Sequence, residues 1–117
     1  MSQITTHILD TARGKPAEGV TILLFVQSPE DPVTSGWRQI AIGTTNSDGR
    51  VPELVPKENS LEPGVYRLRF EIKEYFEKQA QLSFYPFVEI TFIVVEGEHY
   101  HVPLLVSPFG YSTYRGS

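Results

Sequence analysis

The sequence predicts an all-β sandwich. Apolar residues recur at every second position along several short segments, which is the period of a strand with one buried face. Two other segments are apolar throughout, as in strands that are covered on both faces. Turn-forming residues separate the segments at Gly14-Lys15-Pro16, Ser47-Asp48-Gly49 and Pro63-Gly64. The length of 117 residues is typical of one domain, so we expect residues 1–117 to form a single unit.

The first half of the chain predicts strands at 4–9, 20–26 and 37–45. The segment 20–26 (VTILLFV) is apolar at every position, so we expect a strand that is covered on both sides. The segments 28–36 (SPEDPVTSG) and 56–64 (PKENSLEPG) are rich in proline and polar residues. We interpret both as exposed loops within the domain.

The second half begins with 65–72 (VYRLRFEI), where every second residue is apolar, which predicts a half-buried strand. Residues 73–81 (KEYFEKQAQ) break this pattern with good helix formers, so we expect a short surface helix there. The segment 90–95 (ITFIVV) is apolar on both faces and predicts another strand that is covered on both sides. Further strands are expected at 101–107 and 112–114.

Composition excludes several kinds of chemistry. The chain has no cysteine, which rules out a disulfide scaffold, a thiolate nucleophile and thiolate-bound zinc. The net charge of −4 gives no reason to expect a nucleic-acid partner. No apolar run reaches the ~20 residues that span a bilayer, and MSQITTHILD lacks the regions of a signal peptide. We therefore expect a cytoplasmic protein without a membrane partner. Trp37 and the aromatic residues that are not assigned to a site below are expected in the core.

Strand parity predicts where two of the three histidines point. In 4–9 the side chain of His7 lies opposite the apolar face, and in 101–107 that of His101 does the same. Leu9 and Leu105 share these outer faces, so the faces are only partly polar. A mixed surface of this kind suits packing against another subunit. We therefore hypothesise that His7 and His101 lie in a cleft formed by association.

Three segments then carry a resemblance. ITTHILDTARGKPAEGV (4–20), TTNSDGRV (44–51) and HYHVPLLVSPFGYSTYRGS (99–117) resemble, in this order, the motifs of the transthyretin-like family of 5-hydroxyisourate hydrolases. The closing YRGS is the most specific motif, because the hormone-carrying transthyretins share the fold but lack the histidines and this tail. Two residues depart from the family pattern: Phe87 stands where an acidic residue is common, and Val106 where leucine is usual.

The resemblance implies a sandwich of two four-stranded sheets with one short helix near 73–81. It also implies a homotetramer, a dimer of dimers, with active sites between the dimers and no cofactor or metal. The substrate implied is 5-hydroxyisourate, an unstable product of urate oxidation in purine degradation. The implied site residues are His7, Arg50, His101, Tyr114, Arg115, Gly116 and Ser117. His99 lies in the same motif and is treated as secondary.

The chemistry of these residue types suits the hydrolysis of a cyclic amide. An imidazole with a pKa near ~6.5 accepts a proton from water and returns it to the leaving nitrogen, so we assign this work to His7 and His101 without deciding between them. The guanidinium groups of Arg50 and Arg115 suit binding of the substrate and stabilisation of an oxyanion.

The tail residues are assigned supporting roles. Gly116 is expected to let the backbone approach the ligand closely. Ser117 offers a hydroxyl and a carboxylate that could position the water or a histidine, and Tyr114 is assigned to substrate binding. We expect this tail to be held at the subunit interface, where it completes the pocket.

Three alternatives stay open. A binding protein of the transthyretin type would hold an aromatic ligand without chemistry. A structural sandwich module would explain the middle of the chain but neither end. A zinc hydrolase would use His7, His99 and His101 as ligands, although no acidic residue nearby obviously supports such ligands.

Overall fold

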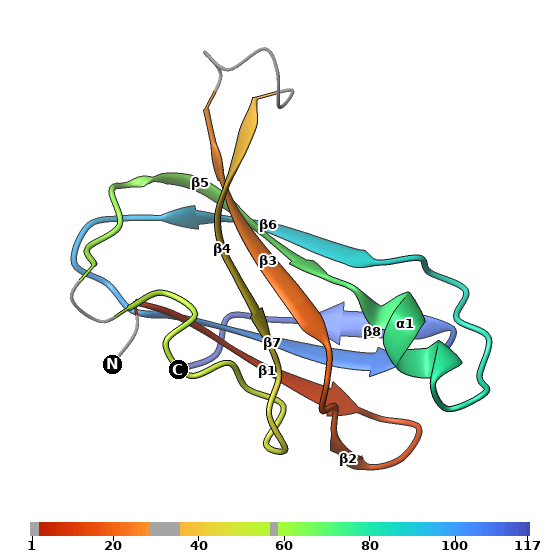
Figure 1. The fold of residues 1–117 in the computed structure, drawn as a ribbon. Helices are drawn as coiled ribbons and strands as arrows, with labels where there is room; N and C mark the ends of the chain where they lie inside the picture. The colour runs from red at the N-terminus through yellow and green to blue at the C-terminus, as the bar shows by residue number, and fades with distance from the viewer. Residues whose placement is uncertain (1–2, 29–35, 57–58) are drawn as a thin grey trace.

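The computed structural model describes residues 3–28, 36–56 and 59–117. It contains eight strands and one helix (Figure 1). The strands are β1 (Ile4–Asp10), β2 (Lys15–Pro16), β3 (Thr21–Gln27), β4 (Trp37–Thr44), β5 (Gly64–Phe70), β6 (Val88–Val94), β7 (Tyr100–Ser107) and β8 (Gly110–Thr113). The helix is α1 (Ile72–Glu77).

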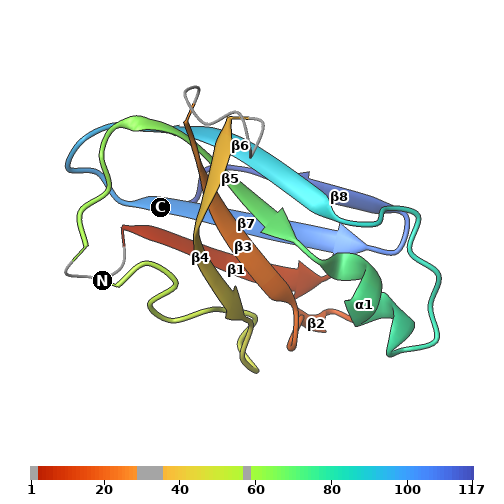
Figure 2. The ribbon, with the colours of Figure 1, turned by 45° about the horizontal axis from the view of Figure 1, so that its top comes forward.

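The strands form two four-stranded sheets, in the orders β2-β1-β7-β8 and β4-β3-β5-β6. The two sheets pack face to face, and α1 lies at one end of the sandwich (Figure 2). Strands β1 and β7 are parallel, whereas the other paired strands are antiparallel. The predicted all-β sandwich with one short helix is confirmed.

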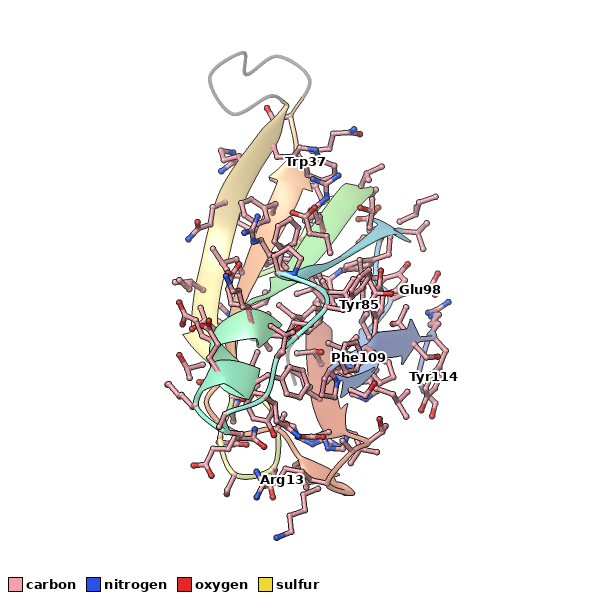
Figure 3. All side chains as sticks on the ribbon, turned by 90° about the vertical axis from the view of Figure 1, so that its right-hand side faces the viewer. Arg13, Trp37, Tyr85, Glu98, Phe109 and Tyr114 are labelled. Carbon is pink, nitrogen blue, oxygen red and sulfur yellow. The ribbon has the colours of Figure 1, made fainter. Side chains whose placement is uncertain are left out.

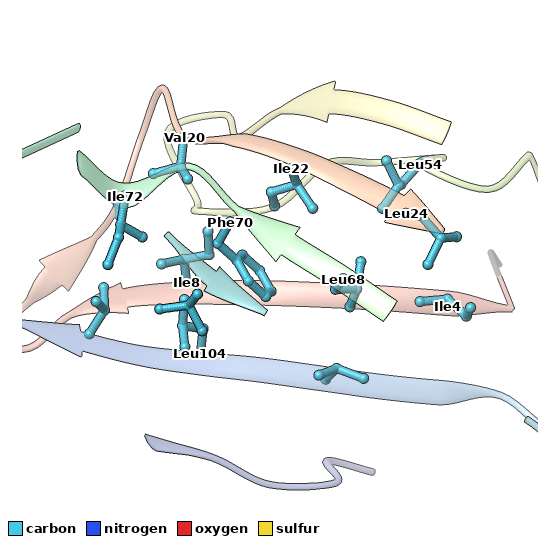
Figure 4. Packing of buried hydrophobic residues seen from close by; sticks show 14 of the residues in the cluster. Ile4, Ile8, Val20, Ile22, Leu24, Leu54, Leu68, Phe70, Ile72 and Leu104 are labelled. Carbon is cyan, nitrogen blue, oxygen red and sulfur yellow. The ribbon is translucent and has the colours of Figure 1, made fainter. Parts of the chain in front are cut away.

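The core fills the space between the sheets. Ile4, Ile8 and Leu104 of one sheet are fully buried and face Leu68 and Phe70 of the other (Figure 4). Burying each of these side chains contributes roughly 1.5–3 kcal/mol to folding. The alternation in β1 follows from this arrangement, because every second residue from Ile4 to Asp10 is buried and those between are partly exposed. The parity predicted for strand 4–9 is therefore confirmed.

The helix is shorter than expected and begins one residue earlier. Strand β5 ends at Phe70, so Ile72 is the first residue of α1 rather than the last of a strand. Ile72, Tyr75 and Phe76 bury one face of the helix against the core. The predicted stretch 73–81 is helical only to Glu77. Its last residues form turns, in which Ala80 has a left-handed φ of 56°.

Four expectations need correction. Strand β6 is not covered on both faces in the single chain, because it is an edge strand and Ile93 is 69% exposed. Strand β2 is only two residues long and lies where the sequence predicted a turn. The assignment of aromatic residues to the core fails for Phe84 and Phe109, which are both 68% exposed. Figure 3 shows Phe109 at the surface. Trp37 is only partly buried and stacks under Arg67, whose guanidinium carbon is 3.9 Å from the ring centroid.

The predicted loop 28–36 lies mostly outside the described residues, as do positions 57–58 of the predicted loop 56–64. Within 3–28, 36–56 and 59–117, no helix has the length and apolar character needed to cross a bilayer.

Candidate active site

The pairing of β1 with β7 brings the two predicted histidines to one surface. In this parallel ladder Thr5 is opposite His101, and His7 is opposite Pro103. His7 therefore lies one diagonal step from His101 on the same face, which corresponds to roughly 8 Å between Cα atoms for ordinary strand spacing and rise. Both imidazoles are partly exposed on the face that points away from the core, as parity predicted.

Arg50 reaches this surface through a tight turn. The side-chain oxygen of Asn46 accepts a hydrogen bond from the backbone N–H of Arg50 at 3.2 Å. Gly49 has a left-handed φ of 73°, which glycine adopts without strain. The carbonyl of Gly49 accepts a hydrogen bond from the N–H of Ile8 at 2.9 Å. This bond holds the turn against β1 next to His7. A Cβ at position 49 would come within 2.5 Å of the carbonyl oxygen of Ile8, so this close approach requires a glycine immediately before Arg50.

Electrostatic coupling also indicates that these groups lie together. Burial lowers the pKa of His7, the positive charge of Arg50 lowers it further, and the backbone and carboxylate of Asp48 oppose this effect. Burial likewise lowers the pKa of His101, and the charges of Arg50, His7 and His99 act in the same direction. We refer to His7, Arg50, His99 and His101 as the outer cluster. The imidazoles of His7 and His101 are consequently more often neutral at pH 7 than free histidine, as a proton acceptor requires.

Sequence reasoning missed Thr5. Its hydroxyl oxygen lies 2.9 Å from Nδ1 of His101 and 3.1 Å from Nε2 of His99. Thr5 shares the outer face of β1 with His7 and is paired with His101 across the ladder. Parity alone placed Thr5 on this face, but only the register of β1 against β7 shows that it touches both histidines.

The end of the chain lies against His101. The N–H of Gly116 donates to the carbonyl of His101 at 2.7 Å, and the two residues form an antiparallel bridge. A Cβ at Gly116 would come within 2.5 Å of Cδ2 of the His101 ring. The glycine was expected to allow a close approach to a ligand, but here it allows a close approach to the imidazole. Ser117 follows directly and is exposed.

Within one chain, the guanidinium of Arg115 meets the outer cluster at the backbone carbonyl of His99, 3.5 Å away, and not at a histidine ring. The guanidinium of Arg115 donates to the carboxylate of Glu98 at 2.9 Å and lies 4.6 Å from the centroid of the Tyr100 ring. Together with parts of β6 and β7, Tyr114 and Arg115 line a hollow of about 490 Å³. Figure 3 shows Glu98 and Tyr114 on the same side of the molecule. Their predicted contact with substrate therefore depends on association and stays a prediction.

The geometry of the outer cluster bears on the zinc alternative. Nε2 of His99 and Nδ1 of His101 both point at the Thr5 hydroxyl, so one nitrogen of each ring already has a partner. Among the residues that the structure describes, no three histidine, aspartate or glutamate side chains are arranged to hold a metal ion.

Fold and site together define a class of protein: a transthyretin-like sandwich whose outer β1–β7 surface carries imidazole and guanidinium groups. A model described as the HIUase/Transthyretin family matches residues 4–116, and the chain belongs to this family.

Known members resemble the chain over nearly its full length. The 5-hydroxyisourate hydrolase of Mus musculus is 43% identical over 117 residues, which covers 99% of this chain and 96% of the mouse protein. A solved structure of Klebsiella pneumoniae 5-hydroxyisourate hydrolase has a TM-score of 0.83 and 35% identity, with 99% and 100% of the two chains covered. Sea bream transthyretin in complex with thyroxine has a TM-score of 0.86 and 31% identity, with 97% and 94% covered. Fold similarity thus extends to a transthyretin in complex with thyroxine, so the function has to be argued from the site.

Proposed function

We propose that this protein is an enzyme that hydrolyses 5-hydroxyisourate, with the outer cluster as its catalytic centre. The observation that carries the proposal is the convergence of His7, Arg50 and His101, from three separate segments, on one sheet face where the chain's end also lies. Relatives that bear the name of this hydrolase support the assignment. A passive apolar binding channel would have no use for such a set of ionisable groups.

The reaction adds water across a ring amide. The oxygen of water attacks the carbonyl carbon, the carbon–nitrogen bond of the ring breaks, and the water proton passes through an imidazole to the leaving nitrogen. The product is 2-oxo-4-hydroxy-4-carboxy-5-ureidoimidazoline. A neutral imidazole is the form that accepts this proton, and the lowered pKa values of His7 and His101 favour that form at neutral pH.

Arg50 is assigned to the charge that develops during attack. Its guanidinium stays protonated and offers parallel N–H donors to the oxygen of the carbonyl under attack. One preorganised donor of this kind lowers a barrier by roughly 3–4 kcal/mol when water is excluded. The positive charge has a second effect, because together with burial it lowers the pKa of His7 and of His101 and so favours their neutral forms.

We assign the exclusion of water from the outer cluster to the formation of a homotetramer, a dimer of dimers. Leu9 and Leu105 are only partly buried on the same face as the histidines. Packing of this mixed face against a partner would enclose the outer cluster. In such an assembly we assign Tyr114, Arg115 and Ser117 to the substrate pocket, with Ser117 positioning the water. We expect the enzyme to work in the cytoplasm without a metal or cofactor.

The direct test generates 5-hydroxyisourate in situ with urate oxidase and follows the decay of its ultraviolet absorbance. The substrate also decays unaided, so the expected result is acceleration over a blank without the protein. The product is identified by trapping and mass spectrometry. A rate equal to the blank, from protein that is folded by circular dichroism, would contradict the proposal. Tight binding of an aromatic ligand in the same sample would then favour the transthyretin type of function.

A further inference from the structure

We propose that Thr5 is a positioning residue that couples the tautomers of His99 and His101, so that His99 shares the proton that His101 handles. The three side chains form a continuous chain of contacts, with Oγ1 of Thr5 at 3.1 Å from His99 and 2.9 Å from His101. The catalytic consequence rests on the proposed hydrolase function. The structural coupling does not, since it follows from the geometry of these three residues.

Counting protons shows why the two rings are linked. A threonine hydroxyl has one proton to donate and lone pairs that accept. It therefore donates to only one of the two ring nitrogens, and the other nitrogen must carry a proton and donate to the hydroxyl. If Nδ1 of His101 is protonated, then Nε2 of His99 accepts from Thr5. If Nδ1 of His101 accepts, then Nε2 of His99 is protonated.

The first of these arrangements suits a general base. With the proton on Nδ1, the Nε2 lone pair of His101 is free to take a proton from water. The resulting imidazolium can pass its Nδ1 proton to the oxygen of Thr5 while the Thr5 proton passes to Nε2 of His99. His99 is then the imidazolium and His101 is neutral, and reversal of the same steps returns the proton for the leaving nitrogen. No atom is gained or lost along this path.

Charged groups around Thr5, His99 and His101 influence which of the two histidines holds the extra proton. Arg50 in the turn and His7 on β1 both disfavour a positive charge on the ring of His101. His99 is flanked by Glu98, whose carboxylate is paired with Arg115. The guanidinium of Arg115 also lies 3.5 Å from the backbone carbonyl of His99. Arg50 follows Gly49, which is hydrogen-bonded to Ile8 of β1, whereas His99 precedes Tyr100, which is opposite Ile4. A proton that passes from His101 to His99 therefore moves away from the positive charge of Arg50, while the carboxylate of Glu98 offsets the positive charge of Arg115 near His99.

The test uses Thr5→Val, which keeps the β-branched shape suited to a strand but removes the hydroxyl. Ring nitrogen NMR of His99 and His101 across pH reports their tautomers. In the unaltered protein we expect one dominant pair of matching tautomers, with the proton of both neutral rings on Nδ1 in the arrangement that suits a general base. Each ring's spectrum should respond when the other titrates. In Thr5→Val we expect mixed tautomers and independent titrations. Thr5→Ser should restore the coupled pattern, because it restores the hydroxyl.

Kinetics supply the second readout. Thr5→Val should lower kcat about tenfold and leave KM unchanged, less than the ~10²-fold loss expected for removing an acid or base itself. Thr44→Val, at an exposed position that ends β4, is the matched control and should change neither constant. Should Thr5→Val fail to fold, His99→Phe provides a second test, because it removes the other hydrogen-bond partner of the Thr5 hydroxyl. It should give His101 the same mixed tautomers.

Wild-type tautomers in Thr5→Val, or in His99→Phe, would overturn the proposal. A coupled tautomer pair in a protein that does not hydrolyse 5-hydroxyisourate would support the coupling and contradict the proposed function. Hydrolysis at the full rate by a Thr5→Val protein with mixed tautomers would support the structural coupling and overturn its catalytic role.

Discussion

The two faces of the β1–β7 pair are built from alternate residues of the same strands, yet they do different work. The inner face carries Ile4, Ile8 and Leu104, which are fully buried between the sheets. The outer face carries Thr5, His7 and His101, of which both histidines are partly exposed. Under the proposed function, the comparison teaches that neighbouring residues of one strand serve stability on one face and chemistry on the other. Substitutions on one face should therefore change the free energy of unfolding, and those on the other should change turnover.

Removal of Tyr114–Ser117 should have the largest effect on turnover. It takes away the backbone that lies on His101 and, in the proposed assembly, the three residues assigned to the substrate pocket. We expect kcat to fall by more than the ~10²–10³-fold that one oxyanion donor contributes. The fold should persist, because β8 ends at Thr113 and the core lies elsewhere. Steady-state kinetics and circular dichroism measure the two quantities. Full turnover by the shortened protein would show that the tail is only packing.

Arg50→Gln should lower kcat/KM about 10²-fold, because the guanidinium is assigned to the developing oxyanion. It should also change the pH dependence. Arg50 lowers the pKa of His7 and of His101 below the ordinary value of 6.5, so its removal raises both pKa values toward 6.5. The acid limb of the kcat/KM profile should therefore move to higher pH.

The matched control for this charge change is Arg13→Gln, which removes an arginine of the exposed turn after β1. We expect it to leave both the rate and the acid limb where they are in the unaltered protein. An acid limb that stays in place in Arg50→Gln would argue that Arg50 does not act on the catalytic imidazoles.

Gly116→Ala should have a moderate effect, about tenfold on kcat. The new methyl would come within 2.5 Å of Cδ2 of His101, so the ring or the tail must move by several tenths of an ångström, and misplaced catalytic groups lose rate steeply. Gly64→Ala is a matched control, since its Cβ would have its nearest neighbour at 3.9 Å. Equal kcat values for the two alanine variants would contradict a tight contact between tail and imidazole.

Ile8→Ala should change turnover least and stability most. Ile8 is fully buried, and removing its side chain costs about 2–5 kcal/mol in free energy of unfolding. At a temperature where the variant is fully folded, kcat should stay within about twofold of the unaltered value. Urea denaturation and kinetics on the same sample measure both. A large loss of kcat with little loss of stability would contradict the proposed division of roles between the inner and outer faces.

Much of this architecture was predictable from the sequence. Parity alone put His7 and His101 on outer faces, because alternation is a local property of each strand. Other features depend on distant contacts. The role of Thr5 requires the register between β1 and β7, which residue pattern does not encode. Strand β2 is too short to show a period.

The position of Arg50 beside His7 followed from family resemblance and not from local pattern. Its physical basis is the bond from Ile8 to the carbonyl of Gly49, which joins two segments about forty residues apart in the chain. The exposed outer face of β6 was missed because an apolar strand looks the same whether a second layer or a partner subunit covers it. The direction of the Arg115 side chain could not be predicted either, because it depends on a hydrogen bond to the carboxylate of Glu98, which is distant in the sequence.

The central claim is that the outer face of β1–β7 performs the chemistry while the inner face holds the fold. The most direct measurement is kcat for 5-hydroxyisourate together with the free energy of unfolding for His101→Asn. We predict that kcat falls at least ~10²-fold, as when a positioned acid or base is lost, and that the free energy of unfolding changes by less than about 1 kcal/mol. An unchanged kcat in a folded protein would remove His101 from the mechanism and contradict the account.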